Sequence, residues 1–186
     1  MKLISIAGIV LLAPFLTLAD TFEINYEISG WTNKRGSDIN LPSTLKISVE
    51  DEKVIIINIS RMMVTSNSYI PENRRLELID ALKKALTWFD KAEEAGLDAT
   101  KEFFTSGEED KANYTSFKFV SSNEGKTGEI VIANCDVERP IRYGKLRLEG
   151  RSSIKNLIRL FESVPDQIEK YKYKKAHPIN PDEILK

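Results

Sequence analysis

Residues 45–57 read LKISVEDEKVIII, and this stretch decides the fold. Its first part alternates apolar and polar residues, a period of two that predicts a strand with one buried face. Glu50-Asp51-Glu52 makes a short polar turn, after which Val54–Ile57 is β-branched throughout. The stretch therefore predicts a β-hairpin. The unbroken apolar run further predicts that the second strand lies inside the sheet, covered on both faces.

The segments on either side of this hairpin predict a further strand and a helix. Residues 22–28 alternate apolar and polar side chains, as a half-buried strand does, and residues 30–42 are expected to form a loop or an irregular edge. From Pro71 the apolar residues recur at steps of three and four, which predicts a helix whose buried stripe is Leu76, Ile79, Leu82, Leu86 and Phe89. Gly96 stands where such a helix would end.

The second half of the chain repeats this pattern. Strands are expected at Phe103-Phe104, Tyr114–Val120, Glu129–Ala133 and Lys145–Glu149, with a hairpin turn between the second and the third. A second helix is expected from about Ser152, with an apolar stripe that reaches Tyr171. Pro165 lies within it and is expected to kink the helix or to divide it in two.

These patterns predict an α+β protein with a mostly antiparallel β-sheet and two main helices on its apolar side. The order of elements indicates a unit of strands followed by a helix that occurs twice, in residues 20–96 and 97–176 of a single domain, before an extended tail at residues 177–186. This order is similar to that of the Whirly and PUR-type single-strand nucleic-acid-binding proteins. The resemblance is one of topology, so it implies a fold and brings no functional residue to this sequence.

Residues 1–19 have the features of a secretory signal peptide. Lys2 is followed by an uncharged, leucine-rich stretch, and Thr17-Leu18-Ala19 suits cleavage before Asp20. An uncleaved anchor is the alternative, because this stretch is at the short limit for a membrane span. We expect export to the periplasm or the exterior, with no membrane span after cleavage. Cys135 is the only cysteine, so no intramolecular disulfide can form.

The composition argues against much familiar catalysis. The chain of 186 residues has one His and one Cys, too few for a soft-metal site or a His-based relay. We therefore assign no catalytic, cofactor-binding or metal-binding residue. The acidic clusters Glu50-Asp51-Glu52 and Glu108-Glu109-Asp110 leave a hydrolase that uses carboxylates alone as an alternative. Asn58 and Asn113 fit the glycosylation pattern, which matters in a host that glycosylates.

Charge is segregated along the chain, although the formal net charge is only −1. Residues 138–175 contain eleven basic and five acidic residues, whereas residues 77–110 contain four basic and ten acidic ones. The opposite signs predict either neutralisation within the fold or a homo-oligomer that weakens as salt rises. Residues 170–175 interleave Tyr with Lys, as a stacking and phosphate-contacting patch would. The C-terminus of a helix favours the same cations.

These features together predict an exported, non-catalytic interaction or assembly module that binds another protein or an anionic surface. Trp and Arg are enriched at the centres of interfaces, and the expected contact residues are Trp31, Arg139, Arg142, Arg147 and Arg151. A carrier that encloses a small apolar ligand between sheet and helices is an alternative beside the hydrolase. Nucleic-acid binding is disfavoured by the slightly negative chain. It would gain support only if basic and exposed aromatic residues shared one sheet face.

Overall fold

The computed structural model describes residues 20–33, 40–61, 64–107, 114–135 and 144–178. Four strands and a helix occur twice in succession: β1 Thr21–Asn33, β2 Asn40–Glu50, β3 Val54–Arg61, β4 Val64–Pro71 and α1 Arg75–Ala95, then β5 Ala99–Thr105, β6 Tyr114–Ser122, β7 Thr127–Cys135, β8 Gly144–Glu149 and α2 Gly150–Ala176. A short 3-10 helix, Glu72–Arg74, precedes α1. The expected α+β class is confirmed. A common origin of the two halves stays a prediction.

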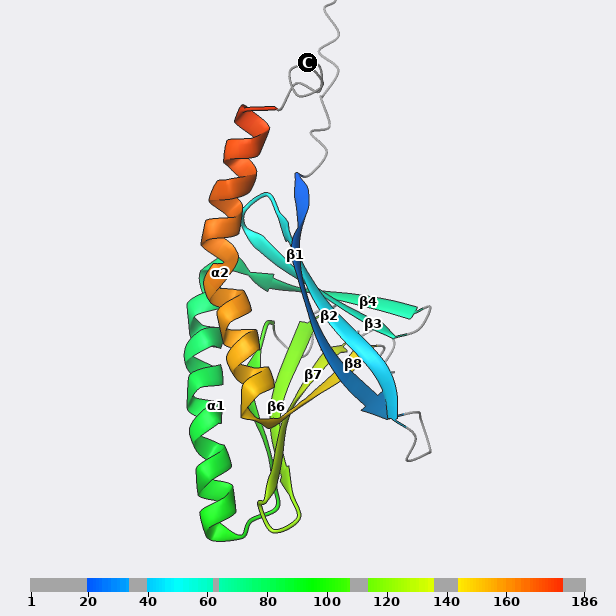
Figure 1. Cartoon of the computed structure of the whole chain (residues 1–186), viewed down its shortest axis with the longest axis vertical. Helices are drawn as coiled ribbons and strands as arrows, with labels where there is room; N and C mark the ends of the chain where they lie inside the picture. Colours follow the sequence, from blue (N-terminus) through cyan, green and yellow to red (C-terminus); the bar gives the residue numbers. More distant parts are fainter. Residues whose placement is uncertain (1–19, 34–39, 62–63, 108–113, 136–143, 179–186) are drawn as a thin grey trace, which may run out of the picture.

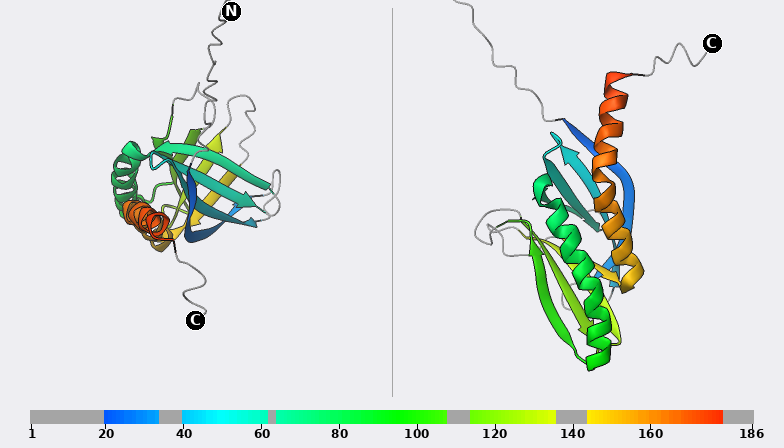
Figure 2. Two further views of the ribbon diagram at one scale, coloured as in Figure 1. Left: turned by 90° about the horizontal axis from the view of Figure 1, so that it is seen from above. Right: turned by 90° about the vertical axis from the view of Figure 1, so that its left-hand side faces the viewer.

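The eight described strands form one antiparallel sheet in the order β4-β3-β2-β1-β8-β7-β6-β5. Its two halves are joined at the pairing of Trp31 in β1 with Arg147 in β8. At this narrow link the two halves of the sheet change direction. Figures 1 and 2 show β1–β4 crossing β6–β8, with both helices packed along one side. β4 lies against β6, β7 and β8, so the inner faces of the halves enclose a common core.

The predicted hairpin of β2 and β3 is confirmed, with Ile47 paired to Ile57. The expectation that β3 is covered on both faces is wrong, because buried and half-buried side chains alternate from Val54 to Ile59. β3 lies between β2 and β4 within the sheet, and only its inner face meets the core. The apolar run therefore reflects an interior position within the sheet, not two packed layers.

Two features of the first half differ from the prediction. The expectation of a loop or an irregular edge at residues 30–42 is wrong in the described part of that range, because β1 continues to Asn33, β2 begins at Asn40, and Thr32 pairs with Leu41. Residues 34–39 lie outside the described residues. Ladder hydrogen bonds use the backbone, so polar and glycine residues do not prevent the pairing. Strand β4, which the sequence did not indicate, reads VTSNSYIP and has a polar outer face at the sheet edge.

Helix α1 ends where the sequence predicts, at Gly96, which adopts a φ of 57°. This left-handed conformation is tolerated by glycine. The buried stripe of α1 is Leu78, Ile79, Leu82, Ala85, Phe89 and Ala92. The expectation for Leu76 is wrong, because its side chain is 62% exposed. Leu76 lies beside the stripe, on a face of α1 that is turned from the core.

Helix α2 continues through Pro165 as one helix, so of the two expected outcomes, a kink or a division, the division does not occur. Pro165 has no N–H, and the carbonyl of Phe161 four residues earlier therefore lacks its usual helical donor. Nη1 of Arg75, at the start of α1, lies 3.2 Å from this carbonyl oxygen and donates to it. A cation from the neighbouring helix thus satisfies the acceptor that Pro165 frees, and α2 continues for three further turns.

The core is one cluster of apolar side chains from both halves and both helices. A buried polar link joins the halves within it. The amide nitrogen of Asn134, in β7, donates to the carbonyl oxygens of Ile57 and Ser66 at 3.1 and 2.9 Å. Its amide oxygen accepts from the Ser68 hydroxyl at 2.7 Å. Because Asn134 belongs to one half and its partners to the other, these bonds set how the halves align.

Candidate functional site

Two of the predicted contact residues lie together, and a third lies elsewhere. Trp31 and Arg147 are paired across β1 and β8, and the Arg147 guanidinium carbon lies 4.8 Å from the centroid of the Trp31 ring. This geometry fits a cation–π contact. Arg151 begins α2 instead, and Arg139 and Arg142 lie outside the described residues. The structure therefore brings one aromatic and one cation of the predicted set into one place.

Trp31 and Arg147 belong to a row of side chains that crosses five strands. The registers align one residue from each of β5, β6, β7, β8 and β1, namely Glu102, Lys118, Val131, Arg147 and Trp31. In β6–β8 the residues next to the row, such as Phe117, Ile132 and Leu146, are fully buried in the core. Side chains alternate between the faces of a strand, so the row lies on the outer face, away from the helices.

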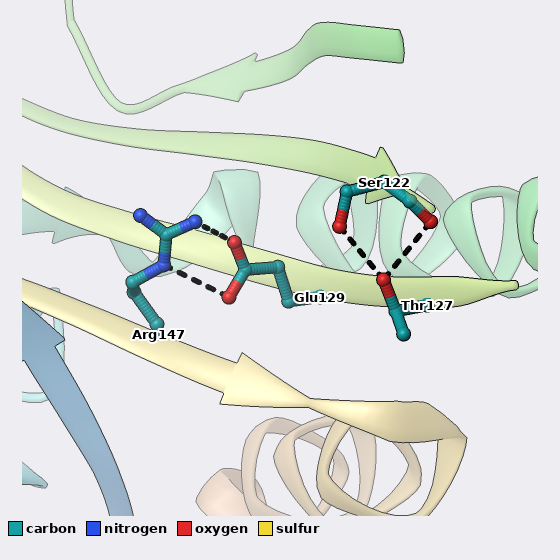
Figure 3. Close-up of polar contacts among 4 residues, drawn as sticks. All are labelled: Ser122, Thr127, Glu129 and Arg147. Atoms are coloured by element: carbon teal, nitrogen blue, oxygen red, sulfur yellow. Dashed lines mark hydrogen bonds and ion pairs between the residues drawn. The ribbon is translucent and has the colours of Figure 1, made fainter. Parts of the chain in front are cut away.

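Arg147 and Glu129 form a largely buried ion pair on this outer face (Figure 3). Nε of Arg147 donates to one carboxylate oxygen of Glu129 at 2.8 Å, and its Nη2 donates to the other. The two side chains are only 20% and 12% exposed. Burial lowers the pKa of Arg147 from its ordinary value, yet a guanidinium remains charged near neutral pH. The pair therefore forms a charged part of the surface that is held in place and has little exposure to solvent.

Beside this pair lies the Trp31 hollow, a cavity of about 180 Å³ lined by Trp31, Ser122, Thr127, Gly128, Glu129, Arg147 and Glu149. The hydroxyls of Ser122 and Thr127 lie 2.7 Å apart, and Figure 3 shows this contact beside the Arg147–Glu129 pair. The hollow thus combines an aromatic ring, hydroxyl groups, one guanidinium and two carboxylates. These groups can hold a polar ligand group by hydrogen bonds and stack against its apolar part.

On the other side of Arg147 lies the Val131 hollow, a cavity of about 300 Å³. Its lining includes three apolar residues and three cations: Val120, Val131, Ala133, Lys118, Lys145 and Arg147. Lys118 forms an ion pair with Glu102 at 3.1 Å. Arg147 lines both hollows, so a ligand in either one would contact it.

The Arg151 contacts join the two oppositely charged segments within the fold. Its Nη2 lies 2.5 Å from Asp90 and 3.8 Å from Glu93, both on α1. Lys83 of α1 likewise pairs with Glu162 of α2 at 2.8 Å. These exposed pairs link helix to helix, so Arg151 has a structural partner on this chain and stands apart from the Trp31 hollow.

The Lys-Tyr run at residues 170–175 also has partners within the fold. The Tyr171 ring stacks on Phe22 with centroids 4.3 Å apart, and Lys172 pairs with Glu52 at 2.8 Å. The first acidic cluster lies at the turn between β2 and β3, whereas Glu108-Glu109-Asp110 and Asn113 lie outside the described residues. The Asn58 side chain donates to the Ser48 hydroxyl at 3.1 Å on the outer face of the first half.

Sequence reasoning missed most of the site. Glu129, Lys118 and Glu149 alternate with apolar residues along their strands, and this period of two could have assigned them to one outer face. Their meeting with Trp31, however, depends on the pairing of β1 with β8, which joins residues more than 100 positions apart.

Comparison with known proteins gives no match: neither a family model, nor a curated protein, nor a solved structure matches this chain. Within the part of the chain that the structure describes, no three His, Cys, Asp or Glu residues are grouped as a metal ion would need. In that same part, neither helix combines the length and the apolar character needed to cross a membrane.

Proposed function

We propose that this protein is an exported, non-catalytic binding module that contacts another protein through the Trp31 hollow. The observation that carries the proposal is the largely buried Arg147–Glu129 pair beside Trp31, on a sheet face that the helices leave uncovered. Replacing a buried ion pair by apolar residues is often neutral or stabilising. Stability alone therefore gives little reason for such a pair, whereas recognition does.

The chemistry of the hollow favours a partner group that is neutral or positively charged. Glu129 and Glu149 outnumber Arg147 by one charge, and Glu129 already neutralises Arg147. An anionic surface is therefore the less favourable partner. Lys118, Lys145 and Trp31 do share the outer face, but Glu102, Glu129 and Glu149 share it too, so it lacks the excess positive charge that binding of nucleic acid requires.

Native mass spectrometry of the protein purified from its own source tests the proposal. We expect a co-purifying protein with the wild type, loss of that protein with Trp31→Ala, and its retention with the control Tyr69→Ala. Tyr69 is another aromatic residue of the sheet, 43% exposed where Trp31 is half-buried, and it lies on β4. Glu149→Lys gives a second variant at an exposed position of the hollow. A bare wild-type monomer, or a partner retained by both hollow variants, would overturn the proposal.

A hydrolase that uses carboxylates is the second candidate, because Glu129 and Glu149 line one hollow. Against it, both oxygens of Glu129 accept hydrogen bonds from Arg147. A carboxylate held in this way is poorly placed to donate a proton. The carrier alternative would need an apolar cavity between sheet and helices, and the two hollows described above do not supply one, because both open on the outer face. Binding is therefore the function that the geometry supports best.

A further inference from the structure

Asp20, the residue after the predicted cleavage point, has its backbone bound to the turn between β2 and β3. Its nitrogen donates to Oδ1 of Asp51 at 2.8 Å. Its carbonyl oxygen accepts from the backbone nitrogen of Asp51 at 3.0 Å. These two bonds continue the pairing of β1 with β2, in which Thr21 lies opposite Glu50. The position of the Asp20 nitrogen is therefore set by the fold.

The side chain of Asp20 is bound to a second element, the end of helix α2. The Tyr171 hydroxyl donates to its Oδ1 at 2.6 Å, and Lys175 Nζ lies 2.5 Å from its Oδ2. The stacking of Tyr171 on Phe22 holds the same end of α2 against β1. Figure 1 shows this part of α2 beside the start of β1. Four polar contacts from two elements thus converge on this one residue.

We propose that cleavage between Ala19 and Asp20 completes this cluster, because the new α-ammonium group of Asp20 forms an ion pair with Asp51. In the hydrolysis, one water molecule supplies the hydroxyl of the new Ala19 carboxyl group and a hydrogen for the Asp20 nitrogen. The carboxyl group ionises, and the nitrogen takes up a proton at neutral pH. A hydrogen bond from a neutral amide to Asp51 is thereby replaced by a charge-assisted one.

The charges around Asp20 support this proposal. Before cleavage, four carboxylates face two lysines, since Asp20, Asp51, Glu52 and Glu169 lie with Lys172 and Lys175. Cleavage adds one positive charge at the Asp51 carboxylate and reduces the excess of negative charge in this set. The mature N-terminus is then part of the fold, and residues placed before Asp20 keep its nitrogen an uncharged amide.

The test compares two purified proteins, one that begins at Asp20 and one that carries Gly-Ser before Asp20. We expect the protein with the free Asp20 nitrogen to melt about 1–3 °C higher at low salt, as one exposed ion pair predicts. The difference should vanish in 1 M NaCl. It should also vanish with Asp51→Asn, and persist with the control Asp80→Asn at an exposed position of α1.

Equal melting temperatures at low salt, or a difference that persists with Asp51→Asn, would overturn the ion pair. The inference rests on the export part of the proposed function, so the intact mass of the protein from its own source is measured separately. A mass that begins at a residue other than Asp20 would overturn the cleavage point. Because the melting experiment needs no partner, a failure of partner binding at the Trp31 hollow would leave its result unchanged.

Discussion

The outer faces of the two halves differ, although both halves have the same order of elements and share one core. On β2–β4 the outer face is mainly hydroxyl, amide and apolar groups, and its Lys46 pairs with Glu23 at 3.0 Å. On β5–β8 charged side chains surround the apolar residues Val120, Val131 and Ala133, and two hollows lie beside Arg147. Since neither outer face belongs to the common core, the fold leaves their chemistry free to differ. The charged face is therefore the better candidate for recognition.

The largest expected effect tests whether the two halves are one folding unit. Ile57→Ala in β3 and Phe161→Ala in α2 each remove a fully buried side chain, and each should lower the free energy of unfolding by about 3–4 kcal/mol. Urea unfolding followed by circular dichroism and by tryptophan fluorescence should give coincident transitions in both variants. Two separate transitions would show that the halves unfold independently and are two domains.

The polar link between the halves should have the next largest effect. Asn134→Ala leaves the carbonyls of Ile57 and Ser66 without this donor, so we expect a loss of about 2–3 kcal/mol in the free energy of unfolding. The control Asn67→Ala, at an exposed position of the β4 outer face, should change it by no more than about 0.5 kcal/mol. Equal effects of the two variants in urea unfolding would contradict the role of Asn134 as a link.

Variants of the Arg147–Glu129 pair can distinguish its contribution to stability from its contribution to partner binding. Glu129→Leu alone leaves Arg147 without this partner, and we expect a loss of about 1–3 kcal/mol in the free energy of unfolding. The double variant Arg147→Leu with Glu129→Leu should recover most of that loss, because the two apolar groups can pack together. It should still fail to bind the partner. If the double variant binds the partner as well as the wild type does, the Arg147–Glu129 pair is not part of the partner-binding surface.

The smallest effect concerns the contact of Asp20, just before β1, with the C-terminal part of α2. Hydrogen bonds from Lys175 and then Tyr171 lower the pKa of Asp20 from its ordinary value of 3.8. The carboxylate is therefore favoured in the folded state, so its contribution is complete above the ordinary pKa and is lost as the pH falls through the lowered one. The urea midpoints of wild type and Asp20→Asn should differ at pH 6 and converge in strong acid. If the difference between the two urea midpoints does not change with pH, the Asp20 carboxylate is not the source of the difference in stability.

Local patterns were enough to predict several elements of the fold. The period of two predicted β1 and β2, a run of β-branched residues predicted β3, and the steps of three and four predicted both helices, because these patterns depend on neighbouring residues. Strand β4 was missed because Ser, Asn and Thr occupy half of its length. The sequence did not show how α2 stays one helix at Pro165, because the donor that replaces the missing bond, Arg75, lies on the other helix.

The candidate site was predicted only in part for the same reason. Trp31 and Arg147 were singled out by residue type, and the structure places them in contact. Glu129 was not singled out, since nothing in its local sequence shows that Arg147 lies beside it on β8. Arg151 was grouped with them, although its partners are Asp90 and Glu93 on α1.

The sequence by itself determined the α+β class, the strand and helix periods and the absence of an intramolecular disulfide, because each depends on composition or on residues close in the chain. Tertiary structure alone decided which charges are paired, which sheet face carries the hollows and where the Asp20 nitrogen lies. These depend on distances between residues far apart in sequence, such as Trp31 and Arg147 or Asp20 and Lys175. Such distances are set only when both halves close on the common core.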